Sequence, residues 1–194
     1  MKVSREQAEK NRRRIVEVAG EMFREHGFDG IGLADLMKKA GLTHGGFYGH
    51  FKSKEALAAE ASARALSKSC DKLAAVADAA SGDALAALVG SYLSDRHRKE
   101  IGKGCAFVAL GADAARHGKP LRSAFAKGVD DYLAVLSDIV PGRTKAEKRK
   151  KAMTTLSGMV GALVLARAVD DENLAKEILV ATAASLTAPT VGNV

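Results

Sequence analysis

Apolar residues recur at helical spacing along most of this chain, and short stretches of Gly, Pro or Ser interrupt them. An early stripe ends at Gly27 and consists of Ile15, Val18, Ala19, Met22 and Phe23. A long helix is predicted from Lys54 to about Ala80, where Ser81-Gly82-Asp83 breaks it. Further helices are predicted at 83–100, 104–117, 119–140, 144–169 and 171–187. The pattern therefore predicts an all-α protein.

A shorter helix precedes a glycine turn near the N-terminus. Its apolar residues fall at i, i+3, i+4 and i+7, on one helical face: Leu33, Leu36, Met37 and Ala40. Gly41 follows where a helix must end in a left-handed turn. Thr43 is expected to cap a second helix with its hydroxyl. On that helix Phe47 and Phe51 lie one turn apart and can be buried together.

Hydrogen-bond donors surround these two phenylalanines, at His44, Tyr48, His50 and Lys54. Two short helices joined by a glycine turn, with donors on the outer face of the second, form the helix-turn-helix arrangement. The preceding stripe adds a third helix, and Ser53 is expected to start the next one. The first 53 residues are therefore predicted to form a three-helix DNA-binding head.

Composition adds less than the pattern does. The formal net charge is +7, of which residues 1–55 contribute +3 from 11 Lys/Arg and 8 Asp/Glu, so charge alone would not identify a DNA-binding protein. The N-terminus lacks a signal-peptide pattern, and the longest apolar run, 156–166, is too short to cross a bilayer. Two cysteines suggest a reducing cytoplasm. We therefore expect a cytoplasmic protein with no membrane partner.

Residues 12–57 resemble the DNA-binding domain of the TetR/AcrR family of bacterial transcriptional repressors. The resemblance includes E-H-G-F at a helix end, the A-G-L-T turn, the segment G-G-F-Y-G-H-F and the restart K-S-K-E-A-L. It implies a helix-turn-helix domain at 1–53 and a helical effector-binding and dimerisation domain at 54–188. Residues 189–194 are expected to be a disordered tail. In such proteins the long helix after the head acts as a pendulum that sets the distance between two recognition helices.

The same resemblance implies which residues contact DNA. Matched by position, they are Thr43, His44, Gly45, Tyr48, His50 and Lys54. Tyr48 and His50 would donate to phosphates, and His44 would read a purine edge. Gly46 and Gly49 depart from the family pattern, in which larger side chains are common. With three glycines, the recognition helix is predicted to be mobile until DNA orders it, and DNA shape should supply part of the specificity.

The segment TLSGMVGALVLARAV is the best candidate for a dimer interface. Its glycines allow close helix approach, and the residues offering area to bury are Leu156, Met159, Val160, Leu163 and Val164. The resemblance implies a four-helix interface here. The alternative is that these residues pack the core of their own subunit.

Cys105 follows Gly102-Lys103-Gly104 and should lie in the first turn of a helix, where the helix dipole and Lys103 favour a thiolate. The Gly-Cys pair resembles a branch of the family in which some members sense electrophiles. The alternative is that Cys105 packs as a small apolar residue, either within the core or in the lining of a ligand pocket. Cys70 is expected to be inert, and the basic cluster at 143–151 to be a solvated helix start.

The sequence therefore predicts a homodimeric transcriptional regulator that binds a palindromic double-stranded DNA operator. A small molecule or thiol-reactive electrophile would release it from that operator. The alternatives are a DNA-packaging protein without an effector, and a small enzyme or carrier that uses the C-terminal pocket. No catalytic constellation is present, so we expect no enzyme activity. His97 and His117 lack metal-ligand spacing, and neither a metal nor a cofactor is expected.

Overall fold

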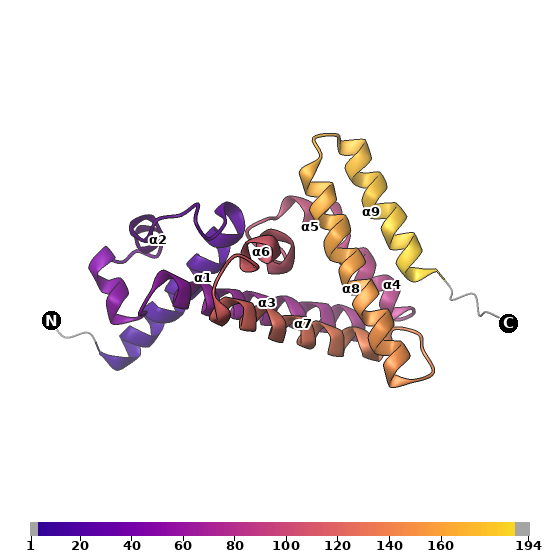
Figure 1. Ribbon diagram of the computed structural model, residues 1–194, viewed down its shortest axis with the longest axis horizontal. Helices are drawn as coiled ribbons and strands as arrows, with labels where there is room; N and C mark the ends of the chain where they lie inside the picture. The colour runs from indigo at the N-terminus through magenta and orange to yellow at the C-terminus, as the bar shows by residue number, and fades with distance from the viewer. Residues whose placement is uncertain (1–3, 189–194) are drawn as a thin grey trace. The chain divides into compact units, whose positions relative to one another are not determined.

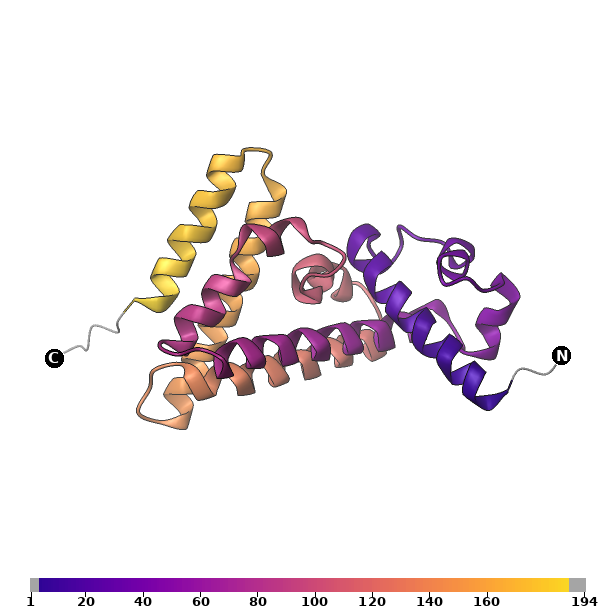
Figure 2. The same ribbon diagram turned by 180° about the vertical axis from the view of Figure 1, so that it is seen from behind.

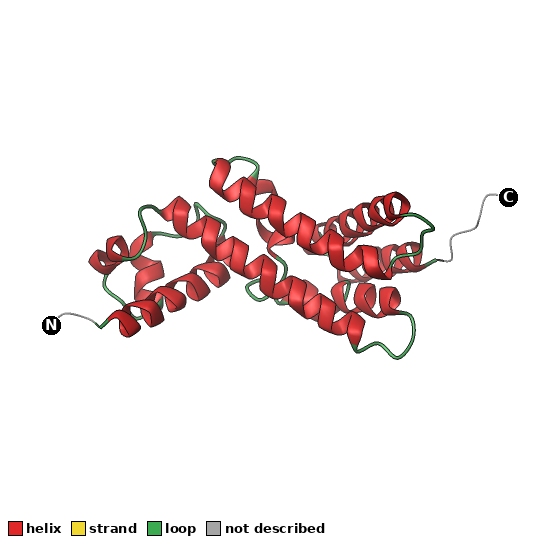
Figure 3. Ribbon diagram, turned by 90° about the horizontal axis from the view of Figure 1, so that it is seen from below, coloured by secondary structure: helices red, strands yellow, loops and turns green. Residues whose placement is uncertain are grey.

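The computed structural model describes residues 4–188, and these contain helices and no strand (Figures 1 and 3). The all-α prediction is confirmed. The elements are α1 (Arg5–His26), α2 (Leu33–Lys39), the 3-10 helix η1 (His44–Gly49), α3 (Lys54–Asp78), α4 (Ala84–Tyr92), α5 (Asp95–Lys99), α6 (Ala106–Ala114), α7 (Lys119–Ile139), α8 (Lys145–Ala168) and α9 (Glu172–Thr187). The predicted tail at 189–194 lies outside the described residues. Among those residues, no helix is long and apolar enough to cross a membrane.

The chain divides into two compact units. The first comprises the residues through Ser67 together with Ile101–Lys127, and the second comprises Lys68–Glu100 together with the residues from Gly128 onward. Helices α3 and α7 each contribute residues to both units. The boundary predicted after residue 53 falls inside the first unit, which also contains α6.

The core of the first unit forms around the apolar stripe of α1. Ile15, Ala19 and Phe23 are fully buried, as their helical spacing predicted. The ring of Phe28, in the loop after α1, packs against Phe23 with ring centres 5.3 Å apart. This loop therefore closes the gap between α1 and α2, which was the expected role of Phe28.

Helix α6 belongs to the same unit because it packs against α1. At its start, Arg24 of α1 donates from Nε to the carbonyl oxygen of Gly102 at 2.8 Å, and also from Nη2. After its end, the His117 ring meets the ring of Phe28 edge-on at 5.0 Å. Both ends of this segment are thereby attached to the head.

In the second unit, α8 and α9 lie side by side (Figure 2). Thr144 and Glu147 form a capping box at the start of α8. Helix α5 is held by Arg98, which is 9% exposed and pairs with Asp95 at 2.9 Å and with Glu172 of α9 at 2.5 Å. These contacts fix a short helix that has little propensity of its own.

The single helix predicted at 83–100 is wrong. The chain leaves the helical conformation at Leu93 (φ −87°, ψ 32°), and α5 starts anew with the Ser94 side chain accepting from the backbone N–H of His97 at 3.2 Å. A serine hydroxyl that caps a new helix competes with continuation of the old one. The other predicted helices are present, with ends displaced by up to three residues.

Candidate nucleic-acid interface

The turn after α2 has the geometry that Gly41 predicted. Gly41 adopts φ 74°, and its N–H donates to Lys38 at 3.0 Å, while the N–H of Leu42 donates to Met37 at 2.9 Å. This pair of bonds is a Schellman motif, which satisfies the last carbonyls of a helix. The turn fixes the direction in which the chain enters η1.

Two buried rings hold η1 against the head. Phe47 is fully buried and stacks on Phe51 with ring centres 5.7 Å apart. On the other side the guanidinium carbon of Arg12 lies 4.5 Å from the centre of the Phe51 ring. Arg12 also donates from both terminal nitrogens to the carboxylate of Glu60, with one bond at 2.6 Å, and these bonds raise the pKa of Arg12. Helices α1 and α3 are thereby tied together behind the segment.

The residues predicted to contact DNA lie at the surface around this anchor. Thr43, His44, Gly45 and Tyr48 are exposed, and His50 and Lys54 are half-buried. Tyr48 is 65% exposed, with its ring edge-on to that of His44 at 6.3 Å between centres. The side chain of Tyr48 is thus presented to solvent, whereas that of its neighbour Phe47 is buried in the core.

Thr43 does not cap η1 with its side chain, contrary to the sequence prediction. Its carbonyl oxygen accepts from the N–H of Gly46 at 3.0 Å, as a tight 3-10 turn requires. The segment is correspondingly a 3-10 helix rather than an α-helix. Ser53 does cap as predicted, because its hydroxyl accepts from the N–H of Ala56 at 3.1 Å.

The three glycines of η1 are not required by the folded head. None of them has a positive φ, since among the described residues only Gly27 and Gly41 do. A Cβ at Gly45 or Gly49 would meet no atom within 4 Å. One at Gly46 would make an ordinary contact with the hydroxyl of Thr43 at 3.5 Å. Any benefit from these glycines must therefore come from mobility or from a bound partner.

The sequence analysis did not predict the contact between Arg24 and Gly102. Burial of the guanidinium lowers the pKa of Arg24, and the nearby carboxylates of Glu21 and Glu25 partly oppose that effect. Cys105 itself is fully buried at the N-cap position of α6. Since the acceptor is a backbone carbonyl, no residue type in the 101–105 loop signals the contact.

Three of the five residues proposed for the dimer interface are buried inside their own subunit. Leu156, Met159 and Leu163 are 7%, 0% and 0% exposed, so they cannot offer area to a partner. Val160 is half-buried, and Val164 is 41% exposed. Leu165 is 56% exposed and was not singled out from the sequence. The three buried residues share one face of α8, at i, i+3 and i+7, and that face turns inward, whereas Val164 and Leu165 lie on another.

Among residues 4–188, no three His, Cys, Asp or Glu side chains gather in a geometry that could hold a metal ion. What the first unit does present is a helix-turn-helix. It has a rigid turn, an anchored second helix and an exposed row of polar donors. This geometry defines the class of helix-turn-helix DNA-binding regulators.

Comparison with known proteins gives the family. Residues 15–61 match the model of the bacterial regulatory proteins of the tetR family. Over 129 residues the chain is 28% identical to the HTH-type transcriptional repressor NemR of Escherichia coli K12, and the match spans 65% of each chain, slightly less than two thirds. The crystal structure of reduced E. coli NemR is similar with a TM-score of 0.77 at 22% identity, covering 94% of this chain and all of that one.

A TetR-family regulator from Cytophaga hutchinsonii is similar with a TM-score of 0.79 at 20% identity over the full length of both chains. At these identities the structural similarity establishes the fold. The matched head adds the function class. Residues 15–61 therefore form a DNA-binding domain of the tetR family, and the chain has the fold of TetR-family regulators.

Proposed function

We propose that this protein is a homodimeric repressor that leaves its operator when α6, or the loop before it, is displaced by an effector. The observation that supports this most directly is the shared packing of α6 and the DNA-binding head in one unit. The relative NemR is named a transcriptional repressor, which favours repression over activation. Two heads on a palindrome would supply the base contacts that one small head lacks.

In the proposed complex, Tyr48, His50 and Lys54 donate to phosphates while Thr43, His44 and Gly45 face the groove. Only Tyr48 and His44 project large polar side chains from the exposed face of η1, so few direct base contacts are available. Replacing Tyr48 by Phe removes one hydroxyl and leaves the fold intact. We expect weaker binding to all duplexes alike, because a lost phosphate contact carries no sequence information.

The dimer would form through the exposed apolar residues of α8 and α9. Val164 and Leu165 on α8 and Val180 on α9 are 41%, 56% and 69% exposed. Leu165→Glu and Val180→Glu should each produce monomers in sedimentation velocity, since a charge buried in an interface is costly. Val129→Glu is the control, because Val129 is also exposed but lies on α7. Dimers that persist in both α8 and α9 variants would refute this interface.

The proposed trigger is Cys105, with addition of its thiol to an electrophilic alkene. A sulfur–carbon bond forms at the β-carbon, the carbon–carbon π bond breaks, and the α-carbon takes up a proton in place of the one lost from sulfur. Because Cys105 is fully buried, an adduct has no room without moving the loop. Arg24 would then lose its acceptor at Gly102, and the support of α1 would change.

The free-energy cost of an adduct at Cys105 is large enough to switch the protein between two states. Overpacking a buried site costs about 1–3 kcal/mol, and loss of a charged hydrogen bond costs about 1.5–3 kcal/mol. Moving a two-state equilibrium from 1:99 to 99:1 takes about 5.5 kcal/mol. Modification of both protomers in a dimer supplies differences of that order.

The test begins with footprinting on the DNA upstream of the gene, which identifies an operator. N-ethylmaleimide should then release the wild-type protein and the Cys70→Ser variant but not Cys105→Ser. Cys70 is the matched control, because it is the other buried cysteine and lies in the second unit. Release that persists in Cys105→Ser would eliminate the cysteine trigger and leave a non-covalent effector. Absence of any preferred site would overturn the repressor assignment.

Arg24→Gln tests the coupling separately. This variant lacks the contact before any alkylation, so it should bind operator more weakly than the wild type, and the alkylating reagent should change its binding less. Arg24→Lys retains charge but cannot donate two bonds to one carbonyl. If both variants are released like the wild type, the contact with Gly102 does not transmit the signal.

A further inference from the structure

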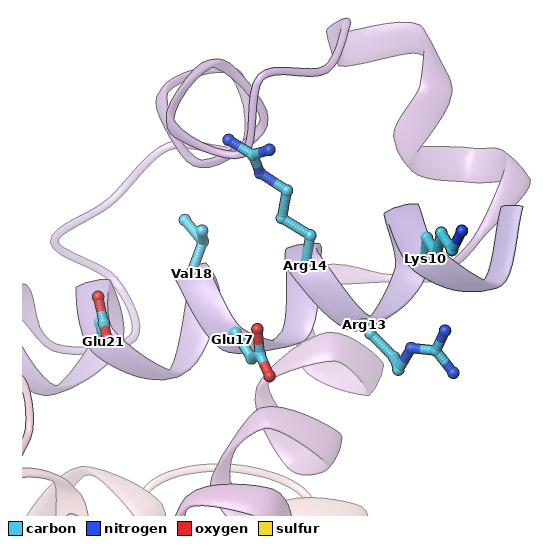
Figure 4. A pocket seen from close by; sticks show the side chains of 6 residues that line it. All are labelled: Lys10, Arg13, Arg14, Glu17, Val18 and Glu21. Carbon is cyan, nitrogen blue, oxygen red and sulfur yellow. The ribbon is translucent and has the colours of Figure 1, made fainter. Parts of the chain in front are cut away.

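The outer face of α1 carries a depression of about 540 Å³ within the first unit. Six residues of this one helix line it, as Figure 4 shows: Lys10, Arg13, Arg14, Glu17, Val18 and Glu21. The half-buried Val18 is its apolar member. None of these residues belongs to the turn or to the recognition segment η1.

The charges in this depression are unequally neutralised. Glu17 accepts from Arg64 of α3 at 2.7 Å, and Lys10 pairs with Glu6 at 2.7 Å. Arg13 and Arg14 are exposed and form no ion pair or hydrogen bond with any residue in the described part of the chain. The other arginines of α1 are engaged: Arg5 with Glu9, Arg12 with Glu60 and Arg24 with Gly102. The guanidinium groups of these two consecutive residues are thus available to anions.

Arg14 lies beside the helix-turn-helix turn. One of its terminal nitrogens is 3.5 Å from the position a Cβ of Gly41 would occupy. Gly41 precedes Thr43 by two residues, and Thr43 leads directly into η1. Figure 4 shows the Arg14 side chain extended away from α1 and Arg13 pointing in another direction. Arg14 therefore places its charge next to the start of the recognition segment.

We propose that Arg13 and Arg14 bind backbone phosphates of the DNA beside the groove that η1 occupies. The inference rests on the proposed DNA-binding function and adds a second row of contacts from α1. The B-form major groove is about 12 Å wide and is bordered by phosphates on both sides. The unpaired Arg14 next to the recognition segment and the unpaired Arg13 on the same helix match that chemistry, because a guanidinium binds a phosphate through two parallel hydrogen bonds.

A purely structural role for Arg14 makes a different prediction. Its charge lies near the C-terminus of α2, where a cation stabilises the helix dipole by about 0.3–1 kcal/mol. In that case Arg14→Gln would lower the melting temperature and leave the salt dependence of DNA binding unchanged. A phosphate contact changes the salt dependence, since each one releases condensed counterions.

The experiment measures fluorescence anisotropy of a labelled 30-base-pair duplex of random sequence over a series of NaCl concentrations. We compare the full-length wild-type protein with Arg13→Gln, Arg14→Gln, Arg14→Lys and Arg122→Gln. Arg122 is the matched control: it is exposed, lies in the first unit on α7, and its side chain has no partner among the described residues. Thermal melting of each variant reports on folding.

For each protomer bound, Arg13→Gln and Arg14→Gln should each make the slope of log K against log[NaCl] shallower by about 1. Arg14→Lys should retain the wild-type slope, and Arg122→Gln should match the wild type. Unchanged slopes for both Gln variants at wild-type melting temperatures would overturn the inference, as would an equal change in Arg122→Gln. If the wild-type protein itself fails to bind the duplex at low salt, the proposed function is what fails.

Discussion

The glycines of η1 give the sharpest test of how the recognition segment works. Replacing Gly45 and Gly49 together by Ala adds two methyl groups that meet no atom within 4 Å. Neither glycine has a positive φ, so Ala adopts the same backbone without strain. A helical Gly is about 0.5–1 kcal/mol less stable than Ala, so the double substitution should stabilise the segment by about 1–2 kcal/mol.

This stabilisation should appear in amide hydrogen exchange of residues 44–50 in the protein without DNA. A gain of one or two kcal/mol corresponds to exchange slower by a factor of about 5–30. In the wild-type protein, exchange of the same residues should slow when DNA is added, because binding orders a mobile segment. In the double variant, most of that protection should already be present before DNA is added.

Two other glycines serve as controls. Gly90 lies within α4, and a Cβ there also meets nothing within 4 Å, so Gly90→Ala should stabilise the second unit and leave residues 44–50 unchanged. Gly41→Ala should act in the opposite direction, since Gly41 has φ 74° and Ala there costs about 1–2 kcal/mol. Equal protection of the wild-type segment with and without DNA would refute the proposed mobility, and unchanged exchange in the double variant would refute the glycine explanation.

Three further perturbations follow from buried or paired groups. Phe47→Ala should destabilise the head by about 3–5 kcal/mol in chemical denaturation, because Phe47 is fully buried. Burial lowers the pKa of His97 from its ordinary 6.5, so the unfolded chain binds a proton at a higher pH than the folded protein does. The free energy of unfolding should therefore fall as the pH drops below about 6.5. In thermal melting, His97→Gln should flatten this pH dependence, whereas His26→Gln should not. The hydrogen bond from Arg98 lowers the pKa of Glu172 from 4.5, so its contribution is present above that pH and lost as pH falls through the lower folded value. Between about pH 5 and pH 3 the melting temperature of Glu172→Gln should therefore fall by less than that of the wild type. Glu177→Gln is the control, and its melting temperature should fall as that of the wild type does.

The parts of the fold that the sequence predicted are those governed by local chemistry. The stripe of Ile15, Ala19 and Phe23 specifies which face of α1 is buried, because spacing along one helix determines which side chains share a side. The turn at Gly41 is similarly local, since only glycine readily takes the backbone angles that a Schellman motif needs. Both features depend on residues within one or two turns of each other.

Two of the outcomes that differed from the sequence predictions also involve contacts between distant residues. Helix α5, which Ser94 caps locally, is also held by Arg167 of α8, which donates from Nη2 to the carbonyl oxygen of His97 at 2.7 Å, across 70 residues. Three of the five dimer candidates on α8 are buried in their own subunit for a related reason. The segment is apolar around much of its circumference, so composition could not show that Leu163 faces inward and Leu165 outward.

The hydrogen bonds between Arg24 and Gly102 connect the loop before Cys105 to the DNA-binding head in the proposed switch, and nothing in the sequence indicated them. The acceptor is a backbone carbonyl, which every residue at position 102 would provide. Only the donor depends on the residue type, and an arginine in the last turn of α1 is equally explained by its favourable interaction with the helix dipole. The contact can therefore be tested at Arg24 and not by exchanging side chains at its acceptor. Because Arg24 and Cys105 lie in the same unit, a change at the thiol needs to travel only across the contact between the loop and α1 to reach the DNA-binding head.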